Sequence, residues 1–153
     1  MEEDYDSAKE YAKKMSGIFG EGNFFLELQD HGIPEQQNVN QQLLKMHRET
    51  GIELVATNDV HYTLAEDAQP HDVLLCLQTG KKLADEDRMR YEGGQYYVKS
   101  PEEMERLFPY APEALENTHK IAQRCHVEIE FGVTKLPKFD VPEGYTSWEY
   151  LNE

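Results

Sequence analysis

Hydrophobic residues in the first half of the chain alternate between helical spacing and short apolar runs. Apolar residues recur every three to four positions in residues 4–19, 34–51 and 67–77. Between these segments lie two short apolar runs, residues 23–28 and 53–57, which are typical of buried strands. This order of helix, strand, helix, strand, helix favours parallel strands joined by crossover helices. The sequence therefore predicts the α/β class.

The same spacing predicts which residues of the three helices face the core. One apolar stripe on each helix is expected to be buried. The predicted inward residues are Ala8, Tyr11, Ala12, Met15 and Ile18 on the first helix, Val39, Leu43 and Met46 on the second, and Val73, Leu74 and Leu77 on the third. Pro34 is suited to the first turn of the second helix, and Gly51 to its end.

The pattern changes after Gly80. Residues 81–94 are charged and contain glycine, which predicts an exposed loop, and residues 96–98 resemble a short strand. Ser100 followed by Pro101 and Glu103 is the signature of a capped helix start. Two helices, 101–108 and 111–125, then form a predicted helical hairpin. Residues 127–145 are expected to be a linker, and a last helix to begin at Thr146.

The chemistry of the chain is concentrated where the two strands end. Asp59 and His61 follow the second strand, and in extended backbone residues two apart point the same way. A carboxylate and an imidazole aimed at one point suit a divalent metal or a phosphoester site. The alternative is that Asp59 only caps the following turn.

Three further residues are weaker candidates. Asp30 and His31 follow the first strand, on what parallel pairing would make the same edge of the sheet. Asp30 is equally suited to capping a turn, and we expect both residues to support the site from behind or to be structural. His71 is expected to lie in the core or behind the ligands.

Composition narrows the possible partners. The 30 acidic and 15 basic residues give a formal charge of −15, a poor surface for unaided DNA binding, which needs clustered Lys and Arg. Cys76 and Cys125 are far apart and outside any CxxC motif, which favours a reducing cytoplasm over a disulfide framework. No apolar run approaches the roughly 18 residues of a membrane span, so no membrane partner is expected.

Seven segments, in order along the chain, resemble the alpha-subunit family of bacterial DNA polymerase III, the replicative polymerase. They are NFFLELQDHGIPEQ (23–36), VATNDVHY (55–62), EDAQPHDVLLCLQTG (66–80), SPEEM (100–104), PEALENT (112–118), IAQRC (121–125) and LPKF (136–139). No single segment is decisive, but seven in the family's order are specific.

The resemblance implies a fold and a domain plan. Residues 1–80 would be the C-terminal portion of a PHP (polymerase and histidinol phosphatase) domain, a distorted (β/α)7 barrel. Residues 81–130 would complete or flank that domain with a loop and helical hairpin, and residues 131–153 would be a linker toward the polymerase palm. The last Asp-x-His of the family's metal cluster matches Asp59 and His61. The resemblance therefore implies Zn, Mn or Mg at this site and a 3′–5′ exonuclease role.

The resemblance also implies limits. The family's earlier metal ligands lie upstream of these residues, and its catalytic aspartates, which use Mg for polymerisation, lie downstream. We therefore expect a fragment of a DNA-directed DNA polymerase that is inactive alone and meets DNA, dNTPs and other replisome subunits through other parts of the parent. The alternatives are a free-standing PHP phosphoesterase and a non-catalytic structural module.

Overall fold

The computed structural model describes residues 4–137 and 139–153, so Met1 to Glu3 and Lys138, which fall in the expected first domain and in the LPKF segment, lie outside the described residues. The helices are α1 (Tyr5–Phe19), α2 (Pro34–Thr50), α3 (Ala68–Thr79), α4 (Pro101–Leu107), α5 (Pro112–Arg124) and α6 (Ser147–Leu151). The strands are β1 (Leu26–Leu28) and β2 (Leu54–Ala56), and two short 3-10 turns are η1 (Ala65–Asp67) and η2 (Glu92–Gly94). The predicted alternation of helix and strand is confirmed.

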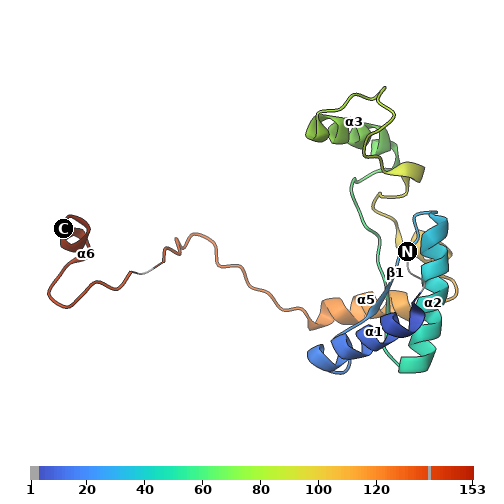
Figure 1. Cartoon of the computed structure of the whole chain (residues 1–153), viewed down its shortest axis with the longest axis horizontal. Coiled ribbons are helices and arrows are strands. Elements are labelled where there is room, and N and C mark those ends of the chain that lie inside the picture. Colours follow the sequence, from blue (N-terminus) through green and yellow to red (C-terminus); the bar gives the residue numbers. More distant parts are fainter. Residues whose placement is uncertain (1–3, 138) are drawn as a thin grey trace.

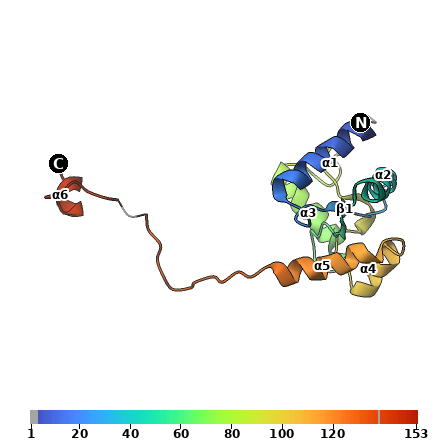
Figure 2. The ribbon, with the colours of Figure 1, turned by 90° about the horizontal axis from the view of Figure 1, so that it is seen from below.

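The two strands are parallel, as the alternation predicts. Leu26 pairs with Leu54 and Leu28 with Ala56, and all four side chains are buried. Helix α5 packs against β2 and helix α2 against β1, so helices cover the strands (Figures 1 and 2). The result is a small α/β layer with both carboxyl strand ends at one edge.

Local sequence signals fix most helix ends. Pro34 opens α2, and Gly51 ends it in the left-handed conformation that glycine adopts without strain. Ser100 caps α4 by accepting the backbone N–H of Glu103, while the Glu103 carboxylate accepts the Ser100 N–H. Thr146 and Glu149 make the same reciprocal pair at the start of α6.

One buried cluster holds the layer together. It joins residues of α1, both strands, α2 and α5 with residues next to these elements, and its members are Ala12, Leu26, Leu28, Met46, Ile52, Leu54, Ala56, Phe108, Ala111 and Ala114. Met104 and Leu107 of α4 pack against it. Asn117 on α5 donates its side-chain N–H to the buried carbonyl oxygen of Leu54 at 2.8 Å. Both apolar packing and a buried hydrogen bond therefore attach α5 to β2.

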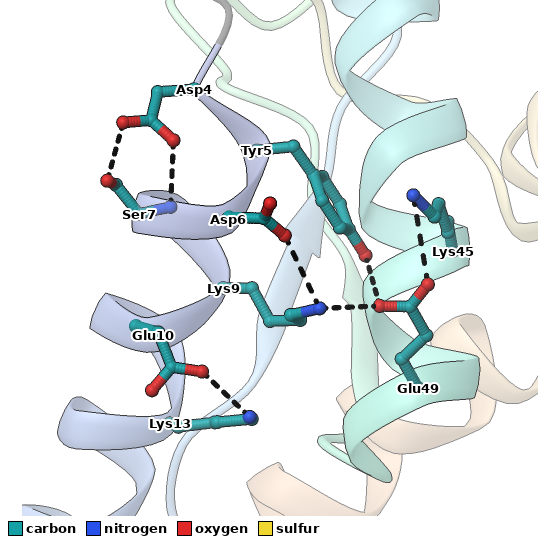
Figure 3. A network of polar contacts seen from close by, with 9 residues as sticks. All are labelled: Asp4, Tyr5, Asp6, Ser7, Lys9, Glu10, Lys13, Lys45 and Glu49. Carbon is teal, nitrogen blue, oxygen red and sulfur yellow. Dashed lines mark hydrogen bonds and ion pairs between the residues drawn. The ribbon is translucent and has the colours of Figure 1, made fainter.

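A polar network joins α1 to α2 at the surface (Figure 3). Glu49 of α2 accepts hydrogen bonds from the Tyr5 hydroxyl and the Lys9 ammonium, each at 3.0 Å. Lys45 lies 4.0 Å above the centre of the Tyr5 ring and 3.7 Å from the other Glu49 oxygen. These partners lower the pKa of Glu49, with the Lys9 hydrogen bond as the largest cause.

Several residues predicted to face the core are exposed, so those predictions are wrong. On α3, Val73, Leu74 and Leu77 are 46%, 60% and 79% exposed, while their neighbours Leu75 and Cys76 are buried. Figure 1 shows the reason: α3 stands apart from the β1–β2 layer and has no sheet beneath it. Four further residues predicted to face inward are exposed as well, namely Ala8, Tyr11, Ile18 and Val39.

The region after α5 is extended. Residues 125–137 and 139–146 contain no helix or strand, in keeping with the expected linker. Figure 1 shows α6 at the end of this extended stretch, far from the layer, and its Trp148 is exposed. Among the residues that the structure describes, no helix combines the length and the apolar character needed to cross a membrane.

Candidate functional site at the carboxyl ends of the strands

The carboxyl edge of the two strands is closed by a segment that returns from η2. Asn58 donates its side-chain N–H to the carbonyl oxygen of Tyr97 at 2.7 Å, and the backbone N–H of His61 donates to Tyr96 at 2.8 Å. An isolated parallel bridge joins Tyr62 to Tyr97. Residues 95–99 therefore lie against residues 58–63, just beyond the end of β2.

Three histidines and three tyrosines from five parts of the chain meet at this edge, and we call them the His–Tyr cluster. Its members are His31, His61, Tyr62, His71, Tyr91 and Tyr96. Tyr96 stacks on His31 with ring centres 4.3 Å apart, and its ring lies 5.6 Å from that of His61 and perpendicular to it. The structure thus brings the histidines that follow both strands to one place.

Asp59 and His61 lie close together, and the backbone fixes the tautomer of the His61 imidazole. Nδ1 of His61 lies 2.9 Å from the backbone carbonyl oxygen of Asp59, which can only accept, so Nδ1 carries the proton. The Nε2 lone pair is then free to bind a metal, an arrangement common in metal-binding histidines. The side chains of His61 and Asp59 are 26% and 51% exposed, and Asp59 Oδ2 lies 3.8 Å from His61 Nδ1.

Asp59 and His61 have donor atoms that suit a metal, but they are only two ligands. Carboxylate oxygen and imidazole nitrogen fit Zn or Mn, and the tautomer of His61 fits ligation through Nε2. Within residues 4–137 and 139–153, however, no group of three or more His, Cys, Asp or Glu side chains is placed to hold a metal. These residues therefore provide at most two ligands.

His31 is the most unusual member of the cluster. It is buried, and the Gln36 side-chain amide makes two hydrogen bonds to it. The amide oxygen accepts the His31 backbone N–H at 2.8 Å, and the amide nitrogen donates to His31 Nδ1 at 2.9 Å. Because the backbone bond fixes the orientation of the amide, Nδ1 is the acceptor and Nε2 carries the proton. Nε2 is buried without a hydrogen-bond partner. Burial lowers the pKa of His31, which favours this neutral form.

The other two candidates are placed differently. Asp30 accepts the backbone N–H of Gly32 at 2.9 Å, a turn contact of the kind expected of a structural Asp. His71, on α3, lies with its ring centre 5.6 Å from that of His61 and 5.3 Å from that of Tyr91. It is therefore close to His61 and only partly buried.

Sequence reasoning missed three residues of this site: Tyr91, Tyr96 and Lys99. Lys99 donates to the side-chain oxygen of Asn58 at 3.2 Å and to the carbonyl oxygen of Gln95, and it lies 4.4 Å from the centre of the Tyr97 ring. Burial lowers its pKa. A loop that is rich in tyrosine yet mostly charged was the available signal, because exposed loops seldom gather large aromatic residues.

The chain is similar to several curated proteins along almost its whole length. It is 42% identical to DNA polymerase III subunit alpha of Helicobacter pylori over 97% of the chain, and 42% identical to the Thermus aquaticus protein of the same name over 100% of it. The protein of that name from Saccharopolyspora erythraea is 46% identical over 96% of the chain.

The chain is related to the alpha subunit of DNA polymerase III.

The match covers the chain but only a small part of each relative. The chain spans about 13% of the length of these DNA polymerase III alpha subunits. No protein-family model matches it. The resemblance found in the seven sequence segments is confirmed, whereas the domain boundaries and the roles of Asp59 and His61 remain predictions.

Proposed function

We propose that this chain acts as one segment of a replicative DNA-directed DNA polymerase, in which the whole polypeptide carries out template-directed DNA synthesis. The observation that supports the proposal most is the identity of 42% or more to named polymerase III alpha subunits from different bacteria, over at least 96% of the chain. Polymerisation, with its Mg ions, would belong to other parts of such a polypeptide. The segment alone would be inactive.

Within that polymerase, residues 1–80 would contribute to the wall of a PHP-type (β/α)7 barrel. The parallel β1–β2 pair and the helix that joins the two strands support this assignment, because they are the repeating unit of such a barrel. Residues 81–130 would flank the barrel, where α4 and α5 cover the strands. Residues 131–153 would lead toward the palm.

Asp59 and His61 would form part of a PHP metal site that serves 3′–5′ exonuclease proofreading. A divalent metal there, Zn, Mn or Mg, would activate a water molecule and stabilise charge on a phosphoryl oxygen. Asp59 would offer a carboxylate oxygen, and His61 its Nε2 lone pair, held in the required tautomer by the Asp59 carbonyl. Further ligands would come from outside the described residues.

The partners would be DNA, dNTPs and other replisome subunits, and the protein would work in the cytoplasm. A formal charge of −15 is consistent with DNA contact through other parts of the polymerase, since phosphate contacts need clustered Lys and Arg.

A non-catalytic structural module of the polymerase is the second candidate. It is favoured by one observation, that the described residues assemble no metal group of three or more ligands. In that case Asp59 and His61 would simply form a turn that docks residues 95–99.

Two experiments test the proposal. An immunoblot of the native gene product with an antibody against this chain should detect a species many times larger than 17.8 kDa. A native band at 17.8 kDa would contradict the polymerase assignment. In the purified polymerase, His61→Ala should abolish metal-dependent exonuclease activity while leaving polymerisation intact, and His119→Ala, on the exposed face of α5, should change neither. Equal exonuclease activity in all three proteins would favour the structural module.

A further inference from the structure

Two polar groups at the carboxyl edge of the strands have no role in the metal pair. They are the Nε2–H of His31 and the ammonium of Lys99. Both are held by other side chains, and the charge of Lys99 lies close enough to His31 to contribute to lowering the pKa of its imidazole. Both also adjoin the residues that carry the metal pair.

The Nε2–H of His31 is a donor without an acceptor. Its ring is clamped by Gln36 on one side and stacked on Tyr96 at 4.3 Å on the other, and Nε2 is buried and unpartnered. A buried N–H without a partner destabilises the folded state, because the group has lost its hydrogen bond to water. This loss of stability is offset only if a hydrogen-bond acceptor, for instance an oxygen of a ligand, reaches the N–H.

Lys99 places an ammonium at this edge. Asn58 directs it, because the same amide donates to Tyr97 and accepts from Lys99. Because Asn58 directly precedes Asp59, this bond holds the ammonium at the exit of β2, the same exit that carries the proposed metal pair. A partly desolvated lysine held in this way is a suitable partner for a phosphoryl oxygen.

The charge at this edge explains why the anion and the metal would bind together. The carboxylates of Glu103 and Asp30 act on the Lys99 ammonium. Those of Asp59 and Asp30 act on His31, so three carboxylates influence these two donors. An anion alone would be repelled. A divalent cation on Asp59 and His61 reverses the local sign and makes the edge attractive to an anion.

We propose that Lys99 and His31 bind a phosphoryl oxygen of a nucleotide, next to a divalent metal held by Asp59 and His61. The inference rests on the metal site proposed above and adds two residues to it. Lys99 supplies a charged donor, and the Nε2–H of His31 a neutral donor whose direction is fixed by Gln36 and Tyr96.

The test follows the imidazole nitrogens of the full chain by NMR, with histidine labelled with ¹⁵N. Zn²⁺ is titrated first, until the His61 resonances no longer change, and dAMP is titrated next, with deoxyadenosine as the probe without phosphate. We expect Zn²⁺ to shift His61, and dAMP but not deoxyadenosine to shift Nε2–H of His31. Lys99→Met should weaken dAMP binding about tenfold or more, the usual loss for one hydrogen bond to a charged group.

Two variants separate binding from structure. Lys120→Met is the matched control, because Lys120 also donates to an asparagine side chain at 3.2 Å but lies on α5. It should bind dAMP as the unmodified chain does, and Lys99→Arg should restore much of the affinity. His31→Phe keeps an aromatic ring against Tyr96 and should weaken binding severalfold. Backbone amide spectra report whether each variant is folded.

The outcomes distinguish two failures. If Zn²⁺ leaves His61 unshifted, the proposed metal site is wrong and this inference falls with it. If Zn²⁺ shifts His61 but dAMP leaves His31 unshifted, or binds Lys99→Met as tightly as Lys120→Met, the phosphoryl site is wrong while the metal site stands. Should Lys99→Met fail to fold, the His31 shift and His31→Phe decide.

Discussion

Two regions of this chain follow similar hydrophobic patterns and yet are stabilised differently. The packed layer, residues 5–57 and 100–124, contains every member of the buried cluster, from Ala12 to Ala114. The peripheral segment, residues 58–98, contains α3 and most of the His–Tyr cluster, and its apolar residues are largely exposed. Helical periodicity predicts a helix in both regions, but it does not say whether anything covers its apolar face.

Polar contacts do in the peripheral segment what apolar packing does in the layer. Arg88, whose side chain is almost fully buried, binds Asp72 of α3 through both oxygens, at 2.5 and 2.7 Å. That bond attaches the charged loop to α3. The candidate chemistry lies where this polar region meets the edge of the layer, which separates the site from the residues that maintain the fold.

The same substitution made in both regions tests the difference between them most strongly. Leu54→Ala removes a fully buried side chain of β2 and should lower the free energy of unfolding by about 2–5 kcal/mol. Leu77→Ala removes an exposed side chain of α3 and should change it by less than about 0.5 kcal/mol. Urea denaturation of both variants measures the difference. Equal losses would mean that α3 is packed as tightly as the layer.

The buried hydrogen bond of Asn117 gives a smaller expected effect. Asn117→Ala leaves the carbonyl of Leu54 without this donor and should cost about 1–3 kcal/mol in the free energy of unfolding. Asn152→Ala removes the same kind of bond, from an asparagine side chain to the Trp148 carbonyl, in the exposed C-terminal region. Chemical denaturation should show no measurable loss for it, and a comparable loss would contradict our view of that region.

The sequence predicted local features of the chain correctly, but not the contacts between distant segments. Pro34, Gly51 and the Ser100–Glu103 pair act on their own backbone neighbours, so they predicted helix ends correctly. Val73, Leu74 and Leu77 were predicted to be buried because they form an apolar face, but burial depends on a partner from elsewhere. The strand exits predicted Asp59 and His61 as candidates, whereas Tyr91 and Tyr96 reach them from a loop some 30 residues later.

The two equivalent capping pairs, Ser100 with Glu103 and Thr146 with Glu149, allow a finer comparison. Ser100→Ala should lower the free energy of unfolding by about 1 kcal/mol, because α4 packs on the layer. Thr146→Ala removes the equivalent bond from α6, which stands apart, and should leave the midpoint of the global transition unchanged. Thermal denaturation of the two variants side by side provides the measurement. A shift of the midpoint in Thr146→Ala would show that α6 unfolds together with the layer.

The smallest expected effect is a dependence on pH that arises from His31. Burial lowers its pKa below the usual 6.5, so between the two values the unfolded chain binds a proton that the folded chain does not. The folded state is therefore favoured fully above pH 6.5 and loses this contribution as the pH falls toward the folded pKa. His31→Phe should lose less stability between pH 7.5 and 5.5 than the unmodified chain does.

The matched variant for that measurement is His119→Phe, whose histidine lies on the exposed face of α5. Its stability should fall with pH as steeply as that of the unmodified chain. If His31→Phe and His119→Phe give the same slope, His31 is not the group responsible.

The central claim is the proposal that Asp59 and His61 form part of a metal site, and zinc binding tests it most directly. Zn²⁺ titrated into the full chain, followed by the imidazole resonances, should shift His61 first, with the weak affinity expected of two ligands. Asp59→Asn should weaken that shift severalfold. A first shift at exposed His119 or His126, or an equal response in Asp59→Asn, would contradict the claim.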